Sequence, residues 1–70
     1  MNLWNYQNIG WVRLTTHTGA SFLGYPIVVN DIDETESGEV EITLENHEWG
    51  RSPFIGFRES EIEKIEIIEE

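Results

Sequence analysis

The sequence predicts an all-β fold, a single domain over residues 1–70 built as a strongly bent, five-stranded small barrel. Two runs of the chain carry this prediction. Residues 39–45 alternate apolar and polar side chains, which is typical of a strand with one buried and one solvent-facing side. Residues 20–30 are too long for a flat strand and contain Gly24 and Pro26, which favour a kink or a bulge. Strong bending allows five short strands to close on themselves.

A first hairpin is predicted just before the bent run. Residues 11–16 alternate in the same way, and the polar link 17–19 ends in Gly19. Glycine readily takes the positive φ that a short hairpin loop requires. The preceding residues 1–10 are interpreted as an irregular arm or as a short helix capped by Asn2.

Two loops and a short strand follow. Residues 31–38 are polar and acidic and end in glycine, which is typical of a surface loop. Residues 46–53 form the second loop, and the apolar residues 54–57 after it are predicted to be a short strand.

The C-terminal segment allows two interpretations. We expect a single 3₁₀ turn over residues 58–60 and then a last strand, because the isoleucines that follow are β-branched and partly alternate with charged residues. A helix over residues 60–70, with Glu63 completing a capping box on Ser60, is the alternative.

Two stretches resemble a known family. Residues 12–25 place a strand, a turn glycine and then a hydrophobic residue two positions before a second glycine, and residues 61–67 are similar to a closing strand. In outline, residues 11–68 resemble Sm-like small barrels within the broader SH3-like group, and also short uncharacterised bacterial proteins of this shape. The resemblance implies a bent barrel that assembles into rings or dimers through its edge strands.

The chain departs from the RNA-binding members of that family. Those members carry a cation next to a glycine in the penultimate strand, whereas Gly56 lies between Ile55 and Phe57. The loop that should contribute an aromatic or apolar residue framed by Asp and Asn reads 30–33 as Asn-Asp-Ile-Asp. The base-binding pocket is therefore not carried over.

A chain of 70 residues supports one thin core. Ordering a residue costs about 1.5 kcal/mol, which a thin core offsets with difficulty. Because no cysteine is present to add disulfides or thiolate zinc sites, self-association is favoured as an additional source of stability. Residues 1–10 are interrupted by polar side chains, and no run approaches the roughly 20 apolar residues that cross a bilayer. We expect a cytoplasmic protein without membrane contact.

Charge excludes more functions than any motif. Fourteen acidic residues against four basic ones give a formal charge of −10. Nucleic-acid binding depends on lysines and arginines that release counterions from phosphates, so this balance argues against it. The same field favours a basic partner, although high net charge also serves solubility alone.

No set of residues supports catalysis, a cofactor or a metal site. The acidic loop starts like a calcium loop at Asp31, but the positions that need glycine and a bidentate glutamate hold Glu36 and Ile42. A solvated loop is the favoured interpretation, with a weak oxygen-ligated cation site as the alternative. His17 and His47 are interpreted as solvated loop residues, and a barrel this small is not expected to hold a substrate pocket of several hundred Å³.

Three tryptophans are an excess for this length. Trp49, Arg51 and Phe54 are predicted to form a partner-binding anchor, with Trp11 as a further contact, because large aromatic residues dominate interface energetics. The alternative is that Trp4 and Trp49 cap the open ends of the thin core.

These observations predict a non-catalytic module that self-assembles or binds a protein partner through an exposed strand edge and the Trp49 region. The alternative is an acidic, charge-based inhibitor or nucleic-acid mimic that binds a basic partner. RNA binding of the Sm type is least favoured on charge grounds.

Overall fold

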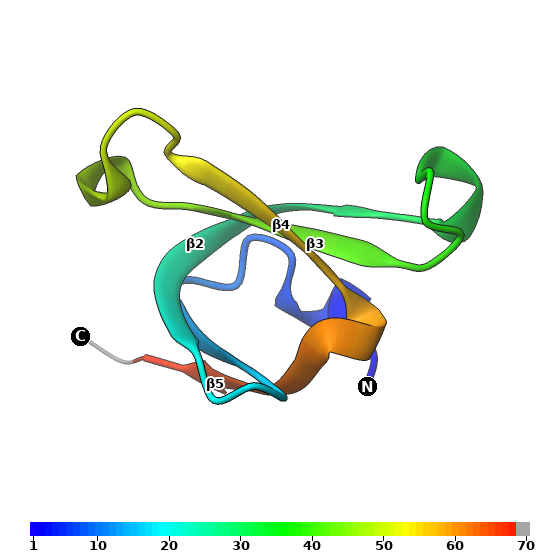
Figure 1. The fold of residues 1–70 in the computed structure, drawn as a ribbon, viewed down its shortest axis with the longest axis horizontal. Coiled ribbons are helices and arrows are strands. Elements are labelled where there is room, and N and C mark those ends of the chain that lie inside the picture. The colour runs from blue at the N-terminus through cyan, green and yellow to red at the C-terminus, as the bar shows by residue number, and fades with distance from the viewer. Residues whose placement is uncertain (69–70) are drawn as a thin grey trace.

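The protein is all-β, as predicted. The computed structural model describes residues 1–68, which form five antiparallel strands and four short 3₁₀ helices (Figure 1). The sheet has the order β4-β3-β2-β1-β5. Its strands are β1 (Val12–Thr16), β2 (Ser21–Asn30), β3 (Glu41–Glu45), β4 (Phe54–Arg58) and β5 (Ile62–Ile67). The 3₁₀ helices are η1 (Leu3–Tyr6), η2 (Ile32–Glu34), η3 (His47–Trp49) and η4 (Glu59–Glu61).

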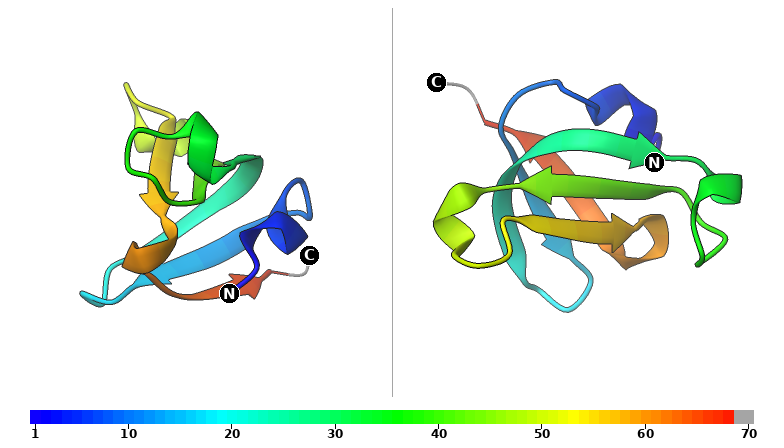
Figure 2. Two further views of the ribbon diagram at one scale, coloured as in Figure 1. Left: turned by 90° about the vertical axis from the view of Figure 1, so that its right-hand side faces the viewer. Right: turned by 90° about the horizontal axis from the view of Figure 1, so that it is seen from above.

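The long strand β2 bends the sheet, which confirms the prediction from its glycine and proline. Its first half pairs with β1 and its second half with β3, and the register shifts between Pro26 and Val28. Figure 2 shows β2 curving from the β1–β5 layer to the β3–β4 layer. A Cβ atom on Gly24 would lie 2.9 Å from the Leu44 Cβ and 3.2 Å from the Trp49 ring. The layers therefore approach this closely only because position 24 has no side chain.

The sheet curls but does not close. Strands β4 and β5 are its two edges, and no register joins them within residues 1–68. A closed barrel is therefore not confirmed. The expected 3₁₀ turn is present as η4, and the segment after it is a strand, so the helical alternative is wrong. Residues 69–70 of that segment lie outside the described residues. No helix in the described part of the chain is long and apolar enough to span a membrane.

The core lies between the two layers of the curled sheet. Strands β1 and β3 contribute two core residues each, and β2, β4, β5 and η1 contribute one each. They are Leu3, Val12, Leu14, Val29, Ile42, Leu44, Phe57 and Ile62. The predicted alternation over 39–45 is confirmed, because Ile42 and Leu44 are fully buried while their neighbours in β3 are half-buried.

The N-terminal arm completes one side of the core. Helix η1 begins after Asn2, whose side chain accepts a hydrogen bond from the Trp4 N–H as predicted for a cap. Leu3 is only 1% exposed. Beyond η1, the Gln7 side chain accepts a hydrogen bond of 2.7 Å from the backbone N–H of Val29 in β2. The N-terminal arm therefore covers the edge of β2 along its second half, which no longer pairs with β1.

Candidate binding site

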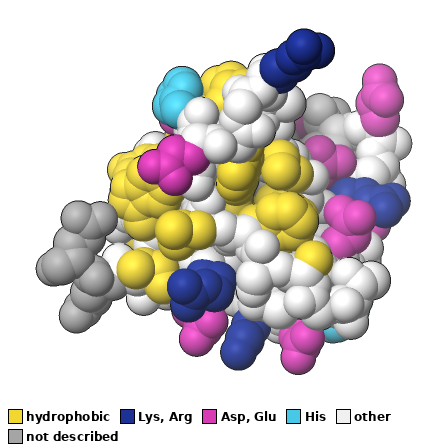
Figure 3. Space-filling model, turned by 60° about the vertical axis from the view of Figure 1, so that its left-hand side comes forward, with side chains coloured by type: hydrophobic (Ala, Val, Ile, Leu, Met, Phe, Trp, Pro, Cys, Tyr) yellow, Lys and Arg dark blue, Asp and Glu magenta, His cyan; other side chains and the backbone are white. Residues whose placement is uncertain are grey.

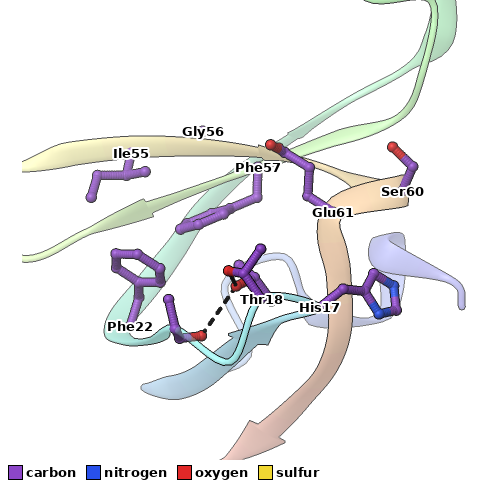
Figure 4. Close-up of a pocket in the computed structure, with 10 residues that line it drawn as sticks. His17, Thr18, Phe22, Ile55, Gly56, Phe57, Ser60 and Glu61 are labelled. Atoms are coloured by element: carbon purple, nitrogen blue, oxygen red, sulfur yellow. Dashed lines mark hydrogen bonds between the residues drawn. The ribbon is translucent and has the colours of Figure 1, made fainter.

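A groove lies where the free edge of β4 faces the β1–β2 hairpin. Its volume is about 400 Å³. Figure 4 shows Phe22 of β2 and Phe57 of β4 pointing toward one another at its floor, with Ser60 and Glu61 of η4 at one end. The expectation that so small a fold has no such cavity is wrong. The space exists because the sheet stays open here, so it lies between the two layers and not inside a closed barrel.

The floor of the groove is aromatic and firmly packed. The Phe22 and Phe57 ring centroids are 5.0 Å apart, and the Phe22 ring meets Trp49 edge-on at 6.4 Å. Tilted and edge-on pairs of this kind add about 0.5–1.5 kcal/mol beyond the area they bury. Phe57 is 5% exposed, so Phe22 is the aromatic ring that the groove leaves accessible. The apolar floor is therefore formed before any ligand arrives.

The backbone of β4 points into the groove at alternate residues. Two hydrogen bonds beyond the strand ends set the phase: Asn46 N–H donates to the Pro53 carbonyl at 2.8 Å, and Glu59 N–H donates to the Val40 carbonyl at 3.0 Å. Such bonded pairs recur at every second position of an antiparallel ladder. The odd-numbered residues of β4 therefore bond to β3, and the backbone groups of the even-numbered residues point to the free edge.

Gly56 is the central residue of that edge. It lines the groove through its backbone alone, since it has no side chain. Neither a positive φ nor crowding requires glycine here, because an added Cβ would meet only the Thr43 Oγ1 at 3.7 Å. A glycine in a strand often marks a place where another backbone approaches closely. Gly56 thus leaves an unobstructed N–H and carbonyl at the middle of the edge.

One end of the edge is held by a carboxylate. Glu61 accepts hydrogen bonds from the Arg58 backbone N–H at 2.9 Å and from the Arg58 guanidinium at 3.3 Å. The backbone bond, and then the side-chain bond, lower the pKa of the Glu61 carboxyl, and the bond to Glu61 raises the pKa of Arg58. Because Arg58 N–H is occupied, Phe54 and Gly56 supply the edge donors that remain.

A second carboxylate fixes the position of η4. The two Glu39 oxygens accept hydrogen bonds from the Ser60 N–H and hydroxyl, each at 3.0 Å. The Met1 ammonium lies 3.7 Å from the Glu59 carboxylate. This end of the groove is therefore ordered, and its three carboxylates, on Glu39, Glu59 and Glu61, outnumber the two cations, Arg58 and the Met1 ammonium.

The residues considered for metal or acid–base chemistry do not converge. Within residues 1–68, no three His, Asp or Glu side chains lie close enough together to hold a metal ion. In the acidic loop, Asp31 and Glu34 form a capping box on η2. His17 is exposed on the rim of the groove, and His47 pairs with Glu45 at 2.9 Å.

The four predicted partner-binding residues differ in burial and in what they contact. Trp49 is half-buried against Phe22, so the capping interpretation holds for it, whereas Trp4 is 46% exposed and Leu3 fills the core in its place. Trp11 packs edge-on against Tyr25 at 6.4 Å. The other two predicted anchors, Arg51 and Phe54, are exposed in the η3–β4 loop and at the start of β4. Figure 3 shows apolar side chains gathered on the face at the left of Figure 1, with charged groups around them.

The sequence prediction missed the groove itself. Phe22 and Phe57 lie 35 positions apart in the chain, and nothing local indicates that they meet. Gly56 was the available signal, because a glycine inside a short apolar strand indicates a close backbone approach.

Comparisons with protein-family models, with curated proteins and with solved structures found no match for this chain. The resemblance to Sm-like or SH3-like domains therefore stays a prediction.

Proposed function

We propose that this protein is a non-catalytic interaction module that binds an extended segment of another protein along the free edge of β4. The observation that carries the proposal is the free backbone of Gly56 beside a preformed apolar groove. In strand addition, main-chain hydrogen bonds provide affinity, and pockets for alternate side chains provide specificity. The edge of β4 and the groove offer these two elements side by side.

Charge favours a foreign segment over a second copy of this chain. Each copy has a formal charge of −10, so two copies that meet edge to edge repel one another. A basic segment is attracted by the same field. Self-assembly through β4 is the alternative occupant, and the test below separates the two.

The test uses a pair of substitutions at one position. Gly56→Pro removes the edge-facing N–H, and proline is tolerated on edge strands where that N–H faces outward. Gly56→Ala keeps the N–H and adds a methyl group in ordinary contact with Thr43. Peptides selected from a random library on the wild-type protein are expected to bind wild type and Gly56→Ala, and to lose at least tenfold in affinity for Gly56→Pro.

Selected peptides that bind Gly56→Pro with unchanged affinity would overturn the proposal. If Gly56→Pro fails to fold, Phe54→Pro removes the other edge donor at the first residue of the strand, with Phe54→Ala as its control. Sedimentation is expected to show a monomer. A dimer that Gly56→Pro dissociates would overturn the foreign occupant and assign the edge to a second copy.

The charge distribution favours one second candidate, an acidic inhibitor or nucleic-acid mimic. Glu39, Glu59 and Glu61 gather around η4 in a chain of net charge −10. Binding of that kind does not need the β4 backbone and weakens steeply as salt screens the charges. Affinity for a basic protein that survives Gly56→Pro but falls at high salt would favour this candidate.

A further inference from the structure

The side chains of a segment added to β4 fall on two faces. Successive residues of a strand point to opposite sides of the sheet, so every second side chain turns toward the groove. Ile55 and Phe57 point to that side from β4, and Phe22 faces them from β2. A side chain entering there meets the apolar floor that these residues form.

The size of the groove limits what it can take. Its 400 Å³ lie at the lower end of the roughly 300–1,000 Å³ that ligand pockets span. The half-buried Phe22 ring offers an accessible face or edge, which suits an aromatic or large aliphatic group. The groove is therefore large enough for a bulky apolar side chain of the added segment.

Acidic side chains outnumber arginines near both ends of β4. Glu61 lines the groove after the strand ends, with Glu59 beside it in η4. At the other end, Glu45 of β3 is the register partner of Phe54 and pairs with His47. Glu48 follows in η3, and the exposed Arg51 lies in the loop before β4. The five residues of β4 separate the two acidic ends by about 14 Å at roughly 3.4 Å per residue.

We infer that the β4 site recognises an extended segment with one bulky apolar residue in its centre and lysine or arginine on both sides. This inference rests on the proposed function, and it names the chemistry of the partner. The apolar residue enters the groove over Phe22, and the flanking cations lie near the acidic ends of the edge. Charge complementarity of this kind raises the association rate and excludes acidic segments.

Three matched synthetic peptides test the inference. The first has two lysines at each end and a central phenylalanine, separated from the lysines by single threonines. The second replaces the lysines with glutamates, and the third replaces the phenylalanine with serine. We expect the first peptide to shift the amide signals of Phe54 and Gly56 and to bind at least tenfold tighter than either of the others.

The outcomes separate the two proposals. Equal affinity of the lysine and glutamate peptides would overturn the charge preference, and equal affinity of the phenylalanine and serine peptides would overturn the role of the groove. If the first peptide fails to bind while library peptides bind in a Gly56-dependent way, this inference is wrong and strand addition stands. If library peptides also ignore Gly56→Pro, the proposed function fails as well.

A variant of the protein gives an independent measurement. Glu61→Gln removes the charge but keeps an oxygen that accepts the Arg58 N–H bond. We expect this variant to bind the lysine peptide about twofold to fivefold more weakly than wild type does. The loss of affinity on replacing the central phenylalanine of the peptide with serine is expected to stay the same. An unchanged affinity for the lysine peptide would overturn the role of this end of the groove.

Discussion

The second half of β2 and the strand β4 both have a free edge, but the chain covers the edge of β2 and leaves the middle of the β4 edge open. In the described part of the chain, 1–68, both strands have a side that no neighbouring strand covers. On β2, the arm supplies partners: Asn8 N–H donates to the Pro26 carbonyl at 2.8 Å, and Gln7 accepts from Val29 N–H. On β4, other residues bond to the two ends of the edge: Glu61 accepts from the Arg58 N–H, and the Ser52 hydroxyl donates to the Phe54 carbonyl at 3.4 Å. Within residues 1–68, the middle of the edge at Gly56 stays open. An edge left open beside a groove differs from one that the chain has covered, and exposed edges invite pairing with another chain.

Removing the anchor of the arm is expected to have the largest effect. Leu3→Ala deletes a fully buried side chain from the core, and such truncations cost about 2–5 kcal/mol. Urea unfolding followed by tryptophan fluorescence measures the loss. Trp4→Ala is the matched control in the same 3₁₀ helix, and its 46% exposed side chain predicts a smaller change. Equal losses for the two variants would contradict the covering role assigned to Leu3.

Alanine substitutions of Gly24 in β2 and Gly56 in β4 test the same comparison between the two strands. Gly24→Ala places a Cβ atom 2.9 Å from the Leu44 Cβ, so overpacking is expected to cost about 1–3 kcal/mol. Gly56→Ala adds a methyl group at an ordinary van der Waals distance from Thr43, and it is expected to change the free energy of unfolding by less than about 0.5 kcal/mol. Thermal unfolding of both variants measures the difference. A large loss at Gly56 would mean that the glycine serves the fold and not the edge.

The hydrogen bond between the arm and β2 is the next test. Gln7→Ala leaves the part-buried Val29 N–H without its acceptor, which costs about 1–2 kcal/mol. Amide hydrogen exchange at Val29 is expected to accelerate, while exchange at Ile42 in β3 follows global unfolding. Gln7→Glu keeps an acceptor oxygen and should retain the protection of Val29. Unchanged exchange at Val29 in Gln7→Ala would show that the arm does not cover this edge in solution.

Local patterns predicted the strands well, and long-range contacts explain what they missed. The alternation over 39–45 and the positive φ at Gly19 follow from neighbours in the chain, and both are confirmed. The contact between Gln7 and Val29 spans 22 positions, and no periodicity signals it. The size of Trp49 indicated an interface, yet its ring packs against Phe22 and the bare backbone of Gly24. Residue type therefore drew attention to Trp49, but only the curled sheet shows what its ring contacts.

The smallest expected effect concerns the Arg58 N–H, which is the donor of the β4 edge that Glu61 occupies. Bonds from Arg58 hold the pKa of Glu61 below its ordinary value, so the ionised carboxylate favours the folded state. That contribution is complete above the pKa of the unfolded chain and is lost as the pH falls through the lower, folded pKa. Because both groups are largely exposed, solvent screening keeps the contribution small.

A nuclear magnetic resonance titration of the Glu61 carboxyl carbon and the Arg58 amide measures this effect. We expect both signals to move together with a midpoint below that of an unpaired glutamate, and Glu61→Gln to abolish the movement of the Arg58 amide. Once Glu61 is protonated, the Arg58 N–H loses its ionised acceptor, and the edge gains a third donor next to Phe54 and Gly56. A titration midpoint at the ordinary glutamate value would mean that the acidic end of β4 is not held as the structure shows.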